Sequence, residues 1–140
     1  CIRDSSSDEL YEILRLRSAV FVVEQQCVYQ DVDNFDQAAH HVMGLTRDDL
    51  ACYARLLAPD IKYRTASIGR VVAYRASRRR GYGKELMNFA IKQCEELWPG
   101  LGITISAQQY LEGFYQQLGF FTASSPYLED DIAHIKMARS

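Results

Sequence analysis

The stretch from Val71 to Ala90, VVAYRASRRRGYGKELMNFA, is the most informative part of this sequence for the fold. It begins with an apolar run that indicates a buried, central strand. Three consecutive arginines and two glycines follow, and apolar residues then recur at the spacing of an amphipathic helix. The first turn of a helix has unpaired N–H groups and a partial positive charge, which favour an anion such as phosphate. The stretch therefore predicts a phosphate-binding loop between a strand and a helix.

The spacing within this loop excludes two common phosphate-binding motifs. A Walker loop requires G-x-x-x-x-G-K-[ST], but Gly83 and Lys84 are followed by a glutamate, and no glycine stands five positions before Gly83. A dinucleotide-binding fingerprint requires a third glycine three positions later, where this chain has Leu86. The pattern that remains is R-x-x-G-x-G, formed by Arg78, Gly81 and Gly83.

The rest of the chain predicts helices and strands of one mixed α/β domain. Ser6 and Glu9 have the spacing of a capping box at the start of a helix. Gly119 suits the left-handed backbone position that ends a second helix. We expect helices at 6–21, from the Arg/Gly loop to 97, and at 111–118, with a short helix and a loop at 22–37. We expect strands at 40–47, 50–59, 66–74, 102–107, 120–124 and 133–139. An acidic loop would join the last two strands. This order predicts a mixed sheet with helices on its faces.

Composition and charge exclude several classes of protein. The 140 residues carry a net charge of −2 with a pI of about 5.9, which argues against a duplex-binding domain. No apolar run is long enough to span a bilayer, and the first residues lack the order of a signal peptide. The four cysteines are scattered and never form C-x-x-C, which predicts reduced thiols in a cytoplasmic protein and no zinc site. They are Cys1, Cys27, Cys52 and Cys94.

Two motifs in this order resemble the GNAT acetyltransferases. R-x-x-G-x-G is similar to their acetyl-CoA pyrophosphate loop, and GFYQQLGF, Gly113 to Phe120, is similar to their F-Y-x-x-x-G-F segment. Over nearly the whole chain the sequence resembles the ElaA subfamily, most clearly at 11–33, 105–120 and 127–139. The chain departs from that subfamily where glycine or proline is usual, at Val28, Arg79, Asp131 and Ala133.

The resemblance implies a fold and a co-substrate. The expected fold is α/β (α+β), with a central mixed, mostly antiparallel twisted sheet and helices on both faces. Residues 1–140 would form a single GNAT domain whose first strand is mostly missing. Acetyl-CoA would be the co-substrate, its pyrophosphate held by the loop and its pantetheine arm paired with the third strand. The implied cofactor-binding residues are Val71, Val72, Ala73, Arg78, Arg79, Arg80, Gly81, Tyr82, Gly83, Lys84 and Gln108.

The resemblance also implies catalytic residues. Tyr115 matches the general acid of the family, and a phenol can protonate a departing thiolate within hydrogen-bond reach; its periodicity alone would make it a core aromatic. Glu24 is a candidate general base acting through water, against the simpler interpretation of a solvated helix charge. The acidic loop at 129–131 could attract a cationic amine, and His134 has no assigned role. No metal is expected, because the adjacent His40 and His41 point to opposite faces of a strand.

The function implied is acetyl-CoA-dependent N-acetylation of a primary amine on a small molecule or peptide. The amine would attack directly in a ternary complex, because no Cys or Ser has an evident activating partner. A non-catalytic acyl-CoA sensor is the alternative, and a nucleic-acid-binding module built on RRRGYGK is a less favoured one. The protein is expected to act as a monomer or homodimer without nucleic acid or membrane partners.

Overall fold

The computed structural model describes residues 6–26, 30–47, 49–74, 78 and 81–140 of the chain. The helices are α1 (Ser7–Arg17), the π-helical η1 (Ser18–Glu24), the 3₁₀ turns η2 (Asp36–Ala38) and η4 (Gln109–Leu111), α2 (Tyr82–Leu97) and α3 (Glu112–Gln117). The strands are β1 (His40–Thr46), β2 (Asp49–Leu57), β3 (Ala66–Ala73), β4 (Ile103–Gln108), β5 (Phe121–Thr122), β6 (Tyr127–Glu129) and β7 (Ile132–Arg139).

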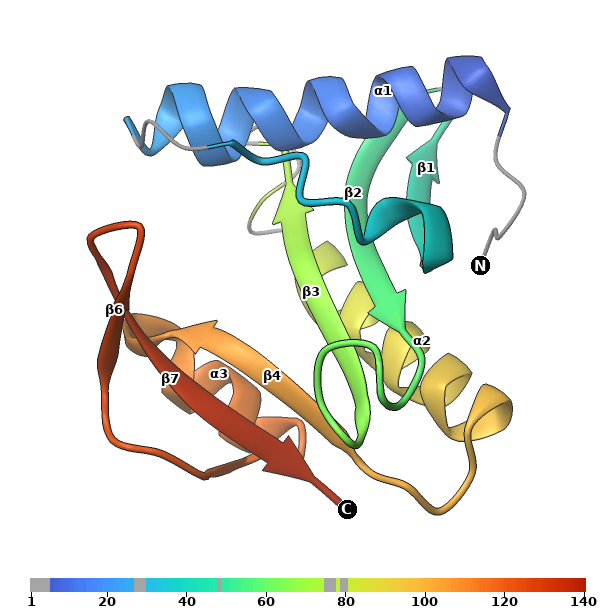
Figure 1. The fold of residues 1–140 in the computed structure, drawn as a ribbon. Helices are drawn as coiled ribbons and strands as arrows, with labels where there is room; N and C mark the ends of the chain where they lie inside the picture. Colours follow the sequence, from blue (N-terminus) through green and yellow to red (C-terminus); the bar gives the residue numbers. More distant parts are fainter. Residues whose placement is uncertain (1–5, 27–29, 48, 75–77, 79–80) are drawn as a thin grey trace.

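The strands form one sheet in the order β1-β2-β3-β4-β7-β5, and β6 pairs with β7. Among the described strands, β3 and β4 pair in parallel and the other neighbours pair antiparallel. Helix α1 crosses one face over β1 to β3, whereas α2 and α3 cover the other face (Figure 1). The mixed, mostly antiparallel sheet with helices on both faces, predicted from the sequence, is confirmed.

Helix α1 begins at the capping box that the sequence predicts. The Ser6 hydroxyl accepts from the Glu9 N–H at 3.2 Å, and the Glu9 carboxylate accepts from the Ser6 N–H at 3.1 Å. The helix was expected to end near Phe21, but its backbone continues as a π-helix, in which the Gln25 N–H donates to the Val20 carbonyl at 3.1 Å. Such wide turns are frequent at functional sites.

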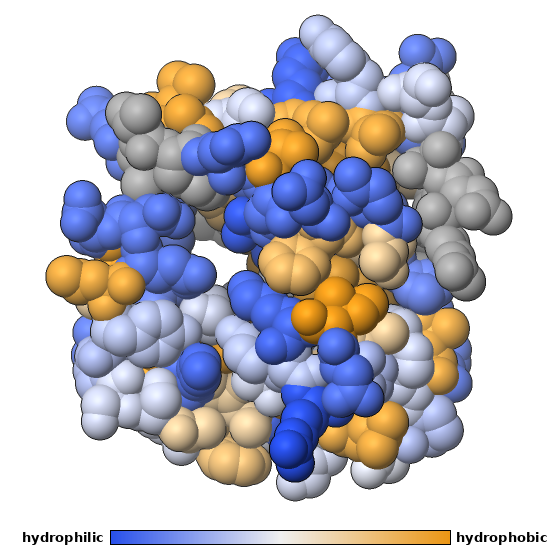
Figure 2. Space-filling model, in the orientation of Figure 1, coloured by the Kyte–Doolittle hydropathy of each residue, from blue (hydrophilic) through white to orange (hydrophobic). Residues whose placement is uncertain are grey.

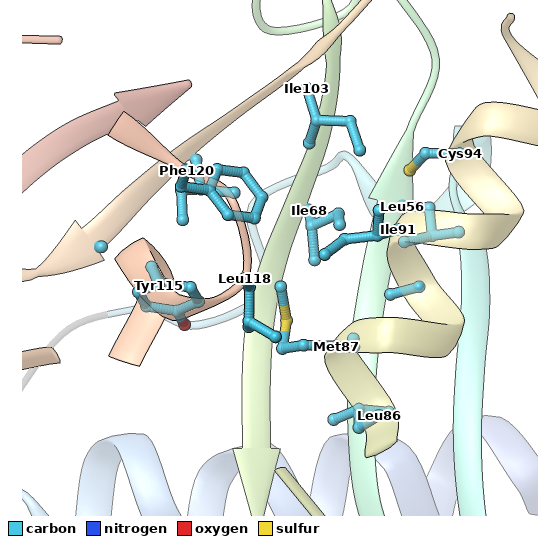
Figure 3. Packing of buried hydrophobic residues seen from close by; sticks show 14 of the residues in the cluster. Leu56, Ile68, Leu86, Met87, Ile91, Cys94, Ile103, Tyr115, Leu118 and Phe120 are labelled. Carbon is cyan, nitrogen blue, oxygen red and sulfur yellow. The ribbon is translucent and has the colours of Figure 1, made fainter. Parts of the chain in front are cut away.

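The main core lies between α2, α3 and the sheet (Figure 3). The apolar stripe predicted on α2 is buried there at Leu86, Met87, Ala90, Ile91 and Cys94. The last member of the stripe, Leu97, is the final residue of the helix and is 40% exposed. Local periodicity thus predicts the packed face of α2 except at its end.

The acidic segment between the last two strands folds differently from the loop that the sequence predicts. Its first half is β6, which pairs antiparallel with β7. Asp130 and Asp131 connect the two strands, with φ values of 50° and 61°, as a two-residue hairpin turn with both central residues left-handed requires. The preceding strand, β5, is limited to Phe121–Thr122 instead of 120–124.

A buried cluster of ion pairs fixes the segment that enters β1. This Arg/Asp cluster consists of Arg17, Arg55, Arg70, Asp31, Asp33 and Asp36. The Arg17 guanidinium, fully buried, lies 2.8 Å from the Asp31 carboxylate and 2.7 Å from that of Asp36. Arg55, also buried, lies 2.7 Å from Asp33. Because each buried charge has an opposite partner, the cluster avoids most of the cost of an isolated buried ion.

The Arg/Asp cluster should make the fold sensitive to acid. Burial alone would raise the pKa of Asp33, but hydrogen bonds and charge from Arg55 outweigh it and lower the pKa of that carboxyl to about 2. The ordinary value is about 3.9, so this stabilisation is nearly complete above about pH 5 and is lost as the pH falls towards 2. We expect the urea concentration at the midpoint of unfolding to decrease as the pH is lowered from about 5 to about 2.5. In Asp33→Asn this decrease should be smaller. An Asp33→Asn midpoint that falls as steeply as the wild-type midpoint would contradict this account.

Candidate active site

The central strands separate in the middle of the sheet. Strands β3 and β4 pair only where Ala66 lies opposite Ile103 and Ser67 lies opposite Thr104. Beyond these residues β3 remains paired with β2, and β4 with β7, but no described strand joins their facing edges. Figure 1 shows the two strands diverging. The sheet thus presents two facing backbone edges that an extended molecule could pair with.

A bulge in β3 accompanies this separation. Val72 lies opposite Tyr53 and Gly69 opposite Arg55, so two residues of β3 face one residue of β2. Arg70, one of the two, has a φ of 49°, a left-handed conformation within a strand. Bulges bend a strand and increase its twist. This bulge lies where β3 turns away from β4.

A cavity of about 300 Å³ lies in the gap. Its walls come from the facing parts of β3 and β4, from η1, from η4 and α3, and from the β6–β7 hairpin. Figure 2 shows the molecule hollowed between α1 and this hairpin, with hydrophilic residues along the border. The cavity therefore lies where elements distant in the sequence meet.

The structure brings most of the predicted site residues to this cavity. Those that line it are Glu24, Val71, Val72, Ala73, Arg78, Gln108 and Tyr115. Gly81, Tyr82, Gly83 and Lys84 form the start of α2, just after Arg78 in the chain, and do not line this cavity. Arg79 and Arg80 lie outside the described residues. Seven of the predicted residues thus lie around one cavity, whereas the role of each stays a prediction.

The start of α2 is shaped to receive an anion. Gly81 is its N-cap, with a φ of 77° that favours glycine, and no side chain caps the helix there. Apart from its chain neighbours and the helix's own backbone, a Cβ added at Gly81 or at Gly83 would meet no atom of the described residues within 4 Å, so these residues leave open space beside the turn. Open space beside uncapped N–H groups is what a phosphate group requires.

Glu24 and Arg78, predicted for different roles, form an ion pair at 2.7 Å. Arg78 also donates two hydrogen bonds to the carbonyl of Ala73, at 3.1 and 3.2 Å. These contacts join η1, the end of β3 and the Arg/Gly loop. The carboxylate of Glu24 is therefore engaged with the loop arginine, an arrangement that gives no support to its role as the general base.

Tyr115 lies in the core and in the cavity wall at once. Its ring packs edge-on against Phe114 and Phe120, and the residue is 6% exposed. Its hydroxyl makes no hydrogen bond to any other described residue. Burial raises the pKa of the phenol to about 12, so it stays protonated at neutral pH. Both interpretations made from the sequence, core aromatic and proton donor, are thus compatible with its position.

A polar network on the β6–β7 hairpin was missed in the sequence. The Ser106 hydroxyl donates to the Glu129 carboxylate at 3.1 Å and is also hydrogen-bonded to the Tyr127 hydroxyl. Nε2 of His134 lies 3.5 Å from the same carboxylate, and His134 pairs across the sheet with Gln108. The signal that could have revealed it is the two-residue alternation at 106 and 108 and at 127 and 129.

The described residues contain neither a cluster of metal-ligating side chains nor a helix that could cross a membrane. No group of three or more His, Cys, Asp or Glu side chains among them could hold a metal ion. His40 contacts Trp98 and His41 bonds to Tyr53, so the two histidines point to opposite faces as predicted. In the part of the chain that the structure describes, no helix is long and apolar enough to cross a membrane.

The chain is similar to known proteins along nearly its whole length. The family model "Acetyltransferase (GNAT) domain" matches residues 2–140. Protein ElaA of Escherichia coli (strain K12) is 42% identical over 136 residues, covering 96% of this chain and 89% of that protein. The crystal structure of an acyl-CoA N-acyltransferase from Pseudomonas aeruginosa has a TM-score of 0.94 at 43% identity, covering 98% of this chain and 93% of the other. An aminoglycoside 6′-N-acetyltransferase complexed with coenzyme A shares the fold, with a TM-score of 0.71 at 14% identity, covering 96% and 91%. The fold expected from the sequence is confirmed.

Proposed function

Because this chain belongs to the GNAT acetyltransferase family, we propose that it transfers an acetyl group from acetyl-CoA to a primary amine of a small molecule or peptide. The observation that carries the proposal is the gap between β3 and β4. Its cavity is lined by Arg78, which precedes the start of α2, and by Tyr115, whose hydroxyl has no hydrogen-bond partner among the described residues. An acyl-CoA has a phosphate end and an extended, amide-containing arm, and this gap offers a place for each.

The residues of this chain fit acetyl-CoA. No described strand pairs with β3 at 71–73 on the side of β4, so backbone groups there other than the Ala73 carbonyl, which accepts from Arg78, can pair with the amides of a pantetheine arm. The uncapped first turn of α2 can hold the pyrophosphate, with Arg78 beside it. The structural relative solved with coenzyme A has the same fold, which supports this assignment.

The reaction would be a direct transfer. An uncharged amine attacks the thioester carbon, a C–N bond forms, and the C–S bond breaks with its electron pair on sulfur. A backbone N–H of β3 near Val72 would stabilise the developing oxyanion. Tyr115 would donate its proton to the departing thiolate. The described cysteines, Cys52 and Cys94, do not line the cavity, which supports attack without a cysteine intermediate.

An acetyl-transfer screen tests the proposal. The protein is mixed with acetyl-CoA and a panel of primary amines, CoA release is followed, and mass spectrometry identifies the acetylated amine. We expect release that depends on both the protein and one class of amine. Binding of acetyl-CoA without release for any amine would instead favour the non-catalytic acyl-CoA sensor.

The helix start can be tested separately by Gly83→Val. The added side chain enters open space, so the fold should persist, but it occupies the region where the pyrophosphate must approach. We expect the affinity for acetyl-CoA, measured by calorimetry, to fall at least about tenfold, or about 1.4 kcal/mol. The matched control is Gly113→Val, which also adds a side chain in open space, on the exposed side of α3. Equal affinities for Gly83→Val and the wild type would refute this role of the loop.

A further inference from the structure

We propose that His134 is the general base that removes the proton from the ammonium group of the acceptor. The inference rests on the proposed function, because it assigns a residue to one step of that reaction. It is carried by the position of His134 in the cavity wall, its hydrogen bond to the backbone and its carboxylate neighbour.

His134 lies on the opposite face of the sheet from Tyr115. Along β7, Ile135 and Met137 are buried in the main core, the core that also contains Tyr115. Successive side chains of a strand point to opposite faces, so His134 faces away from that core. Both residues line the same cavity. A thioester in the gap would therefore have the proton donor on one face and His134 on the other, where an incoming amine has room.

The tautomer of His134 is set by its backbone contact. Nδ1 lies 2.7 Å from the carbonyl oxygen of Ile132. A carbonyl oxygen can only accept, so Nδ1 carries the hydrogen and donates it. In the neutral ring the lone pair is then on Nε2, the nitrogen nearer the Glu129 carboxylate. The backbone thus presents His134 as a proton acceptor at a defined atom.

The surroundings of His134 hold the ring in place. Its side chain is only 12% exposed, and its ring stacks on that of Tyr127 at 6.3 Å. The Glu129 carboxylate lies 3.5 Å from Nε2 and is itself held by the Ser106 hydroxyl. These contacts fix the position of Nε2, the ring nitrogen that would take the proton.

The other candidate base is less well placed. The Glu24 carboxylate is paired with the Arg78 guanidinium at 2.7 Å. To accept a proton from an ammonium group it would have to give up that pair. Nε2 of His134 has no such cation to release among the described residues, since its close ionic partner is an acid.

The proton balance closes with these groups. Nε2 takes one proton from R–NH₃⁺, and the R–NH₂ that results attacks the thioester. As the C–S bond breaks, the thiolate takes the proton of the Tyr115 hydroxyl. The adduct nitrogen, which still carries two hydrogens, then gives one of them to the Tyr115 oxygen and becomes the amide nitrogen. The products are R–NH–acetyl, CoA–SH and an imidazolium, which releases its proton to water beside Glu129.

The test compares two acceptors in His134→Gln. One is the best primary alkylamine of the panel, which is protonated at neutral pH, and the other is hydroxylamine, which is largely uncharged there. We expect kcat/KM for the alkylamine to fall at least about tenfold; this lower bound is below the roughly 100-fold or more of a typical general base, because water can still accept the proton. For hydroxylamine we expect a change of less than about threefold, because no proton has to be removed before attack. Lys136→Gln, on the same face of β7 but outside the cavity, should change neither rate.

Two other results would contradict the role of His134 as the general base. Equal losses for both acceptors would show a structural role, and no loss for either would show no role. If His134→Gln does not fold, Glu129→Gln provides the second test, with the same selective loss for the alkylamine expected at a smaller size. If the wild-type protein releases CoA with neither acceptor, the proposed function itself is refuted. If the wild-type protein is active and His134→Gln keeps that activity, only the role of His134 is refuted.

Discussion

Replacing Arg17 with leucine should lower the free energy of unfolding by about 3–5 kcal/mol, the range for breaking a buried ion pair on one side. The substitution leaves the Asp31 carboxylate, buried with it, without its nearest cation, and removes a partner of Asp36. The loss is a large part of the roughly 5–15 kcal/mol that stabilises an ordinary domain. Urea unfolding followed by circular dichroism measures it.

Arg15→Leu is the matched control for this prediction. It lies on the same helix, but its ion pair with Glu12 is on the surface, where the Arg15 side chain is 59% exposed. Exposed pairs contribute about 0–1 kcal/mol. If Arg17→Leu and Arg15→Leu lowered the free energy of unfolding equally, the Arg/Asp cluster would not hold the segment between η1 and β1 as the structure indicates.

Replacing Tyr115 with phenylalanine should lower the rate of acetyl transfer by about 100-fold or more, as expected for a lost general acid. The substitution removes one oxygen and keeps the ring, so the contacts with Phe114 and Phe120 remain. The hydroxyl has no partner among the described residues, so its removal leaves no buried group unsatisfied. The affinity for acetyl-CoA should change by at most about 1 kcal/mol, the size of one hydrogen bond.

A single-turnover measurement isolates the step that Tyr115 would assist. The protein is in excess over acetyl-CoA, so the release of products does not limit the observed rate. The control is Tyr11→Phe, which makes the same change on the exposed surface of α1. Full activity of Tyr115→Phe would exclude the acid, and a proportional loss of stability and activity would identify Tyr115 as a core aromatic alone.

Local patterns in the sequence predicted the parts of the fold that depend on local interactions. The capping box at Ser6 and Glu9 and the buried face of α2 follow from contacts three or four residues apart, and both are confirmed. Strand β6 was missed because three residues become a strand only by pairing with β7, and its turn, Asp130–Asp131, has no glycine to mark it. The π-helical geometry of η1 likewise has no local signal.

The candidate site divides in the same way. The Arg/Gly loop and Tyr115 were recognised through motifs that are continuous in the chain. The Arg/Asp cluster joins side chains up to 39 residues apart, and charged residues are normally predicted to face solvent. The network of Ser106, Glu129 and His134 requires β4, β6 and β7 to be in register, which no single stretch of sequence specifies.

The most direct test of the central claim is a crystal structure of the protein with coenzyme A. The account predicts the pyrophosphate at the first turn of α2, the pantetheine arm paired with the backbone of β3 at 71–73, and the sulfur within hydrogen-bond reach of the Tyr115 hydroxyl. Coenzyme A bound outside the gap between β3 and β4, or bound there with its sulfur out of reach of Tyr115, would contradict it.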